Sequence, residues 1–223
     1  MESDGIYNAY IKPLEELFER YYKSKEDLNT ETLLEIDFNL LQDIIQSSKE
    51  KVAKGAILYV FLKEDCLKIL HNIVVSSRDL ELRRFIESVL IEKKDIKTLK
   101  LMIYLANQGS LINRRKLLET IGEIAPNDDK KVEDLFRRFL MYGDQNSVEG
   151  ALIGAGKLKN MNLLPEIISC LNKHTSEYVR IAAVEALDNY KHLGEVTDLL
   201  KNISKNDLYD LVRIKAAESL SSF

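Results

Sequence analysis

The sequence predicts an all-α fold in which helical hairpins stack into a solenoid, and three observations support this prediction. The first is an internal repeat: the nine residues 179–187 (VRIAAVEAL) return at 212–220 (VRIKAAESL), 33 residues later. Repeats of about this period, written in helix-forming residues, bury their apolar faces against their neighbours. The second is that apolar residues recur with helical spacing along almost the whole chain, without strand-like alternation of useful length. The third is that 223 residues include only three prolines, which leaves little room for long irregular segments.

The first 48 residues are the least repeat-like, and we expect residues 1–48 to form a divergent helical pair ahead of one continuous repeat array over residues 49–223. Residues 5–25 predict an amphipathic helix rich in tyrosine, and capping-type residues at 29–33 open a second helix. A solenoid needs an end cap because its first repeat would otherwise expose core. Tyrosine is also enriched among interface anchors, so the first helix is interpreted either as a cap or as a docking face.

Weaker copies of the repeat precede the two clear ones. Residues 150–158 align with residues 179–187 at an offset of 29, and they keep the small residues but not the arginine. Further upstream only the apolar spacing survives, in two more predicted helix pairs, 82–86 with 96–105 and 117–121 with 132–139.

Turn and capping residues mark the expected helix boundaries. Asp128 and Asp129 place acids at the start of one helix, and Pro126 stops the helix before it. Pro165 fits the first turn of another helix, where its missing N–H costs nothing. Glycines stand where hairpins are expected to turn, at Gly109, Gly143 and Gly194. About a dozen helices result.

The two clear copies resemble the first helix of HEAT-like repeats of the short bilin-lyase type, whose signature is an acidic residue, then Val-Arg, paired small residues and Leu. The matching residues are Val179, Arg180 and Leu187 in one copy and Val212, Arg213 and Leu220 in the other. The resemblance is specific over 177–223, weaker over 145–173 and only periodic before that. It implies a right-handed superhelix of about five to six hairpins. We expect the arginines to be structural, with Glu177 and Asp210 as their partners.

The charge pattern favours a protein partner over nucleic acid. A net charge of −4 and a pI near 5.6 argue against a footprint for phosphates. In HEAT-type solenoids the second helices usually line the concave surface, and alternating signs along their outward row suit a protein. The candidate partner-binding residues are Asp134, Arg137, Glu166, Lys173, Glu195, Asp198 and Lys201, with Met141 and Ser169 in the same row.

Four basic pairs are the best candidates for nucleic-acid binding: Arg83-Arg84, Arg114-Arg115, Lys130-Lys131 and Arg137-Arg138. Each pair is interleaved with acids, so a solvated face is the favoured interpretation.

The sequence predicts no catalytic residue, no metal site and no cofactor. His71, His174 and His192 each stand alone, without a partner at metal-ligand spacing. Cys66 and His71 are five residues apart, which points them away from each other on a helix. The glycines at 150, 154 and 156 fit a tight helix crossing better than a phosphate loop, because no Lys-Ser or Lys-Thr follows them.

Three groups of enzymes use similar repeats. The HEAT-like deoxyhypusine hydroxylases need His-Glu pairs, and the HEAT-like alkylpurine DNA glycosylases use aromatic residues that include Trp in a basic groove. The chain has no His-Glu pair and no Trp. The bilin lyases share the repeat itself, which carries their fold and not a reaction.

Cysteine usage and hydropathy predict a cytoplasmic protein. Cys66 and Cys170 fall in units that are not neighbours, among apolar residues where a free thiol behaves as a small hydrophobe. Residues 1–5 lack the positive flank and apolar run of a signal peptide. The longest apolar run, residues 56–62, is too short to span a bilayer.

The sequence therefore predicts a non-catalytic protein-binding scaffold that uses the concave face of a HEAT-like solenoid. Two alternatives stay open: a nucleic-acid-binding module that uses the arginine pairs, and an accessory subunit of a lyase-like enzyme complex.

The last predicted helix lacks a following helix to cover it. We expect it to be a cap with a polar back formed by Lys215, Glu218 and Ser219. The alternative is that it packs on another chain, so self-association through this helix is also kept as a hypothesis.

Overall fold

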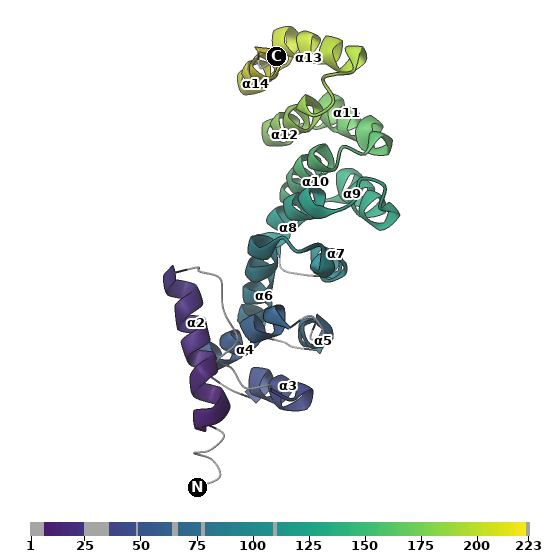
Figure 1. Ribbon diagram of the computed structural model, residues 1–223. Helices are drawn as coiled ribbons and strands as arrows, with labels where there is room; N and C mark the ends of the chain where they lie inside the picture. Colours follow the sequence, from purple (N-terminus) through teal and green to yellow (C-terminus); the bar gives the residue numbers. More distant parts are fainter. Residues whose placement is uncertain are drawn as a thin grey trace. The chain divides into compact units, whose positions relative to one another are not determined.

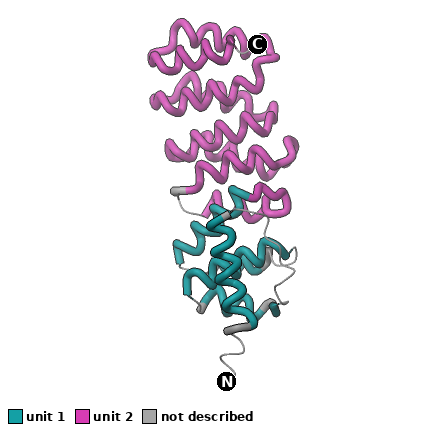
Figure 2. The backbone as a smooth tube through the Cα atoms, turned by 60° about the vertical axis from the view of Figure 1, so that its left-hand side comes forward, with its two compact units in different colours: residues 1–92 teal, residues 93–223 magenta. Residues whose placement is uncertain are grey.

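The computed structural model describes residues 7–24, 36–47, 49–63, 67–76, 79–108 and 111–221, and these residues form helices and turns without any strand (Figure 1). They contain thirteen α-helices, so the all-α prediction and the expected number of helices are confirmed. The chain divides into two compact units, residues 1–92 and 93–223 (Figure 2). Each unit is described by itself. The boundary predicted after residue 48 stays a prediction about how the repeat array begins.

Unit 1 is a set of packed helices. Its elements are a π-helical turn Tyr7–Ile11, α2 Lys12–Ser24, α3 Phe38–Ser47, α4 Glu50–Leu62, α5 Leu67–Ser76 and α6 Leu80–Lys93, whose last residue already belongs to unit 2. The amphipathic helix predicted over residues 5–25 is confirmed for its described part. The helix start predicted at Asn29 and the thiol of Cys66 lie outside the described residues.

Helix α2 lies against α4 at very short range. A Cβ atom on Gly55 of α4 would lie 1.9 Å from the carbonyl oxygen of Leu14. Leu14, Leu17 and Tyr21 are buried, whereas Tyr22 is exposed. Burial of one whole face of α2 supports the interpretation as a cap, since that face is used inside unit 1.

Unit 2 alternates between two helical layers (Figure 1). The first layer consists of α8 Leu111–Ile124, α10 Gln145–Leu158, α12 Glu177–Asp188 and α14 Asp210–Ser221. The second layer consists of α7 Leu99–Gln108, α9 Lys130–Tyr142, α11 Leu164–Lys173 and α13 Gly194–Asn206. Short 3-10 turns, Ile96–Thr98 and Met161–Leu163, lead into α7 and α11. This stacking of helix pairs is the predicted α-solenoid.

The predicted helix signals are found where the sequence placed them. The Asp129 side chain caps α9 by accepting the N–H groups of Lys131 and Val132 at 2.9 and 3.3 Å. Pro165 occupies the first turn of α11, and α8 ends two residues before Pro126. Gly109 lies outside the described residues.

Two other glycines mark boundaries in unit 2. Gly143 ends α9 and Gly194 begins α13. Both therefore lie at the helix boundaries where turns were expected.

The register predicted for the third copy was wrong. The N-cap residues of α10 and α12 are Asp144 and Ser176, which are 32 residues apart and not 29. Helix α14 begins 33 residues after α12, as predicted. Small residues alone misled the alignment, because several of them follow one another in α10.

Glycine allows the first-layer helices to approach closely. A Cβ on Gly122 of α8 would lie 2.0 Å from the carbonyl oxygen of Gly154 in α10. A Cβ on Gly150 would meet the backbone of Arg115, and one on Gly156 the backbone of Ala186. Backbone lies against backbone at each step from α8 to α12, so these glycines are required by the helix crossings.

We predict that Gly154→Ala destabilises unit 2 by about 1–3 kcal/mol or more, because the new methyl would lie 2.5 Å from the carbonyl oxygen of Leu118. Urea unfolding monitored by circular dichroism measures the change. The control is Gly194→Ala, since nothing lies within 4 Å of a Cβ there. Equal stability of Gly154→Ala and the wild type would contradict the close crossing of α8 and α10.

Candidate protein-binding surface

The predicted partner-binding row lies entirely on α9, α11 and α13 of the second layer. Five of its seven charged residues have exposed side chains: Asp134, Lys173, Glu195, Asp198 and Lys201. The other two, Arg137 and Glu166, are half-buried. The row therefore contains two kinds of residue, exposed charges and a pair that is used inside the fold.

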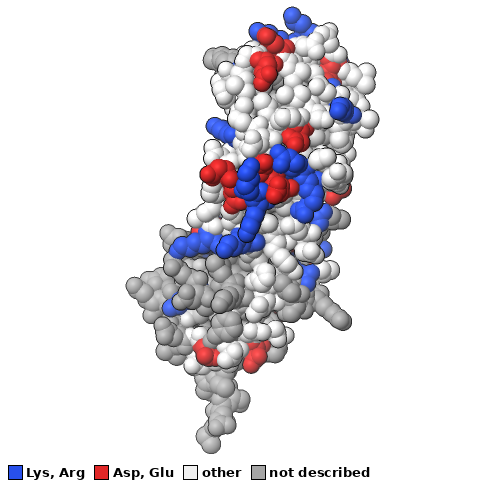
Figure 3. All heavy atoms as spheres, turned by 90° about the vertical axis from the view of Figure 1, so that its right-hand side faces the viewer, with Lys and Arg blue, Asp and Glu red and all other residues white. Residues whose placement is uncertain are grey.

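Arg137 links α9 to α11 and to the turn before it. Its Nε donates to Oε1 of Glu166 at 2.7 Å. Its Nη1 donates to Oε1 of Glu133 at 3.1 Å, and its Nη2 donates to the carbonyl oxygen of Asn162 at 3.0 Å. Figure 3 faces this layer and shows acidic and basic side chains gathered in the middle of it. A guanidinium that makes three such bonds across two helices holds adjacent repeats together.

Glu133 is the buried centre of this cluster, which the sequence did not reveal. Its carboxylate accepts hydrogen bonds from Asn162 at 3.0 Å, Lys130 at 3.0 Å and Asn160 at 3.1 Å. These bonds, together with the one from Arg137, lower the pKa of Glu133 to about 2. In the sequence, an acidic residue between apolar positions of a helix is interpreted as facing solvent. The burial of Glu133 becomes evident only from the residues that surround it in the structure.

The low pKa of Glu133 predicts a pH dependence of stability. A depressed folded-state pKa means that the carboxylate contributes stability above its ordinary pKa, and that this contribution disappears as the pH falls from about 5 to about 2. We expect Glu133→Gln to be less stable than the wild type at pH 7, and the difference in unfolding free energy to shrink across that window. Urea titrations at several pH values measure it. A difference that stays constant down to pH 2 would show that Glu133 is not held as an anion.

Helix α13 carries the most accessible part of the row. Lys201 Nζ lies 3.1 Å from Asp198 Oδ1, and both side chains are more than half exposed. Glu195 lies one turn earlier on the same helix and is also exposed. These side chains bond to no other helix in the described structure, so they are accessible to a partner protein.

Both motif arginines bond to other groups of unit 2, and the predicted partner of one of them was wrong. Arg180 pairs with Asp207, which lies in the turn after α13, and also donates to the carbonyl oxygen of Leu171. Glu177 was expected in that place. Arg213 pairs with Asp210 as predicted. Val179, Val212 and Leu187 are fully buried, and Leu220 is half-buried.

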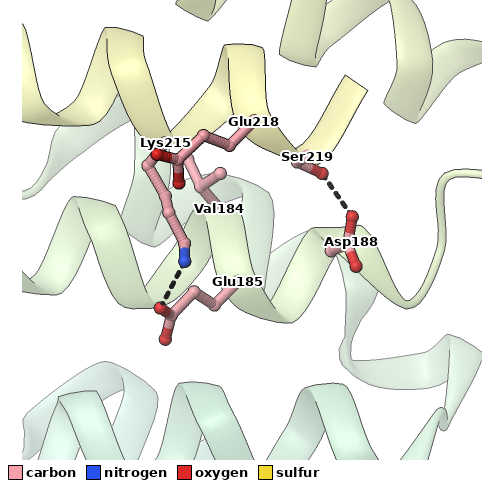
Figure 4. A pocket seen from close by; sticks show the side chains of 6 residues that line it. All are labelled: Val184, Glu185, Asp188, Lys215, Glu218 and Ser219. Carbon is pink, nitrogen blue, oxygen red and sulfur yellow. Dashed lines mark hydrogen bonds and ion pairs between the residues drawn. The ribbon is translucent and has the colours of Figure 1, made fainter. Parts of the chain in front are cut away.

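A pocket of about 340 Å³ lies between α12 and α14 (Figure 4). Its lining residues are Val184, Glu185, Asp188, Lys215, Glu218 and Ser219. Lys215 Nζ lies 3.0 Å from Glu185 Oε1, and this bond raises the pKa of Lys215. The Ser219 hydroxyl donates to Asp188. The polar groups of the pocket are thus mostly bonded to one another across the contact of the two helices.

Helices α12 and α14 therefore repeat one arrangement. Each buries its motif valine, and its arginine bonds to Asp207 in the turn before α14, Arg180 to the carboxylate and Arg213 to the carbonyl oxygen. Residues 143–221 match the family model for HEAT repeats. This confirms the resemblance predicted for the C-terminal third. A comparison with curated proteins gives no significant match. Among the described helices, none is long and apolar enough to cross a membrane.

We expect Arg180 and Arg213 to differ in their contribution to stability. We predict that Asp207→Ala costs about 3 kcal/mol, because it leaves Arg180 without its carboxylate in a site where the Asp207 side chain is fully buried. Arg213→Ala should cost about 1 kcal/mol or less, since Asp210 is largely exposed. Urea unfolding of both variants compares them, and an equal loss would contradict the assignment of Asp207.

Cys170 and His174, in the segment that matches HEAT repeats, make separate hydrogen bonds. Cys170 is buried, its Sγ lies 3.7 Å from the carbonyl oxygen of Leu140, and burial raises its pKa to about 11. His174 ends α11, and its Nδ1 accepts the N–H of Ser176 at 3.1 Å. A thiol with a raised pKa is a poor nucleophile. In the described part of the chain, no group of three His, Cys, Asp or Glu residues could hold a metal ion.

The polar back predicted for α14 is present only in part, because Glu218 is exposed while Lys215 and Ser219 bond to α12. Lys215 and Ser219 point toward α12 (Figure 4). The outward side of α14 also carries Leu211 and Ile214, which are 52% and 53% exposed. The small and polar residues of α14 are needed for its contact with α12, which leaves the larger apolar residues outside.

Proposed function

We propose that the HEAT-repeat part of this protein is a non-catalytic scaffold that binds another protein through its second helical layer. The observation that carries the proposal is that helices of the two layers use their side chains differently. Helices α8, α10 and α12 of the first layer pack on one another through close crossings at Gly122, Gly150 and Gly156. Helices α11 and α13 of the second layer present Lys173, Glu195 and the Asp198–Lys201 pair to solvent. Repeat solenoids use such extended surfaces for recognition.

Preorganisation supports the same proposal. Arg137 with Glu166, and Arg180 with Asp207, fix neighbouring repeats by charge-assisted hydrogen bonds. A surface whose backbone is already fixed loses little conformational entropy when a partner binds. Mixed charge signs on that surface select a partner by complementarity and oppose unspecific binding.

The proposal includes a cytoplasmic location and the absence of any cofactor. The buried free thiol of Cys170 is compatible with a reducing compartment. Residues 1–48 are proposed as the cap of the array, with Tyr21 and Leu17 buried and Tyr22 left for solvent.

The experiment that tests the proposal exchanges the charges of one exposed pair. The variant Asp198→Lys/Lys201→Asp keeps the net charge and the i,i+3 spacing, but it inverts the pattern on α13. We expect at least a fivefold lower yield of a stoichiometric protein partner when the tagged variant is used for capture from native lysate treated with nuclease. The melting temperature should stay within about 2 °C of the wild type, because the pair touches no other helix.

The matched control exchanges another exposed i,i+3 pair, Glu81→Arg/Arg84→Glu in α6 of unit 1, whose side chains lie 2.8 Å apart. Capture should be unaffected. Equal losses in both variants, or capture that survives the exchange on α13, would contradict binding through the second layer. Arg137 is not used in this test, because its replacement would break the contact of α9 with α11 and lower stability.

A further inference from the structure

One stretch of unit 2 has a charge opposite to that of the chain. Residues 93–142 contain eleven Lys and Arg against seven Asp and Glu, whereas the whole chain has a net charge of −4. Figure 3 shows Lys and Arg side chains gathered in a band on the face of the second layer. Three of these cations, Lys100 on α7 with Lys131 and Arg138 on α9, are all exposed, and we name them the basic strip.

A hydrogen bond between α7 and α9 relates the two helices that carry the strip. Arg138 donates to the side chain of Asn107, which brings the ends of the two helices together. Both are second helices of successive hairpins and so run in the same direction. Lys100 precedes Asn107 by seven residues and Lys131 precedes Arg138 by seven. The two lysines are therefore at the same level, about 10 Å back along the helices.

Two acids of α9 near the strip, Glu133 and Asp134, are engaged with other cations. Glu133 accepts bonds from Lys130 and Arg137, on the side of α9 that meets α11. Asp134 also leans toward Arg137, at 3.9 Å. Among the described residues, neither the ammonium group of Lys100 nor that of Lys131 has an ion-pair partner.

Arg138 is held in place at the other end of the strip. Its guanidinium lies 5.5 Å from the centre of the Phe139 ring, and that of Arg114 lies 5.6 Å from the same centre. Tyr142 follows on the same side of α9, and it is 78% exposed. The surface therefore combines the three cations of the basic strip with an exposed tyrosine that can serve as an aromatic anchor.

We propose that the basic strip binds an acidic polypeptide segment of a partner protein. The inference rests on the proposed function and names the chemistry of the partner. Two helical turns, about 10 Å, correspond to about three residues of extended chain, so two or three carboxylates of one segment can meet all the cations. Nucleic acid fits this surface less well for two reasons. The guanidinium groups of Arg114 and Arg138 already lie against the Phe139 ring, which is then not available to stack on a base. The net negative charge of the chain also disfavours binding of phosphates.

The test uses fluorescence anisotropy with a labelled twelve-residue peptide of alternating Glu and Ser at about 50 mM salt, where exposed charges are weakly screened. We expect binding to the full chain and at least fivefold weaker binding to both Lys100→Gln/Lys131→Gln and Lys131→Glu, since each variant lowers the charge of the strip by two. The matched control is Lys12→Gln/Lys23→Gln, which removes two exposed lysines from α2 of unit 1. It should change the affinity less than twofold.

Three results would overturn the proposal: no binding of the peptide, an equal loss in the control, or retained affinity in Lys100→Gln/Lys131→Gln. Tighter binding of a twelve-nucleotide single strand than of the peptide would assign the strip to nucleic acid instead. These failures are distinguishable from failure of the proposed function. Partner capture that depends on Asp198 and Lys201 can persist even when the acidic peptide does not bind to the basic strip.

Discussion

The close crossing of α8 and α10 is the constraint on which the rest of unit 2 depends. Gly122 and Gly154 bring two backbones together at a distance that no side chain would permit. From α8 to α12 the first layer is packed backbone to backbone, so the facing sides of these helices are used inside the fold. The second layer is joined by side chains, and its outward positions therefore carry long polar residues.

Charge-assisted bonds add a second kind of link between neighbouring repeats. Arg115 with Glu149, Arg137 with Glu166, and Arg180 with Asp207 join residues that are 34, 29 and 27 positions apart. Each link connects one repeat only to the next, as expected for a quasi-one-dimensional array. Breaking one link should weaken one interface and leave the others intact, so stability and recognition can be separated by choosing residues that make no such link.

Features that recur along the chain could be predicted from the sequence, whereas contacts that occur only once could not. The repeated VRI segments, the capping Asp129 and the position of Pro165 are local signals, so helix type, repeat period and several boundaries followed from them. The partner of Arg180 could not be predicted, because Asp207 lies 27 residues away in another turn. Loop length decides which acid reaches the arginine, and loop length is the least regular part of a repeat.

The candidate surface shows the same limit. The sequence placed Arg137 and Lys201 in one row, and the structure separates a half-buried link from an exposed charge. That difference depends on Glu133 and the turn before α11, which complete the cluster around Arg137. The basic strip was equally hidden, since Lys100 and Lys131 are 31 residues apart and belong to different helices, α7 and α9.

The central claim is that the second helical layer meets a protein partner, and cross-linking mass spectrometry of the captured complex with a lysine-reactive reagent tests it most directly. The account predicts partner cross-links at the second-layer lysines Lys131, Lys173, Lys201 and Lys205, with few at Lys116 and Lys157 of the first layer. Cross-links confined to Lys12 and Lys23 of α2, or to the first layer, would contradict the account and move the interface away from the second layer.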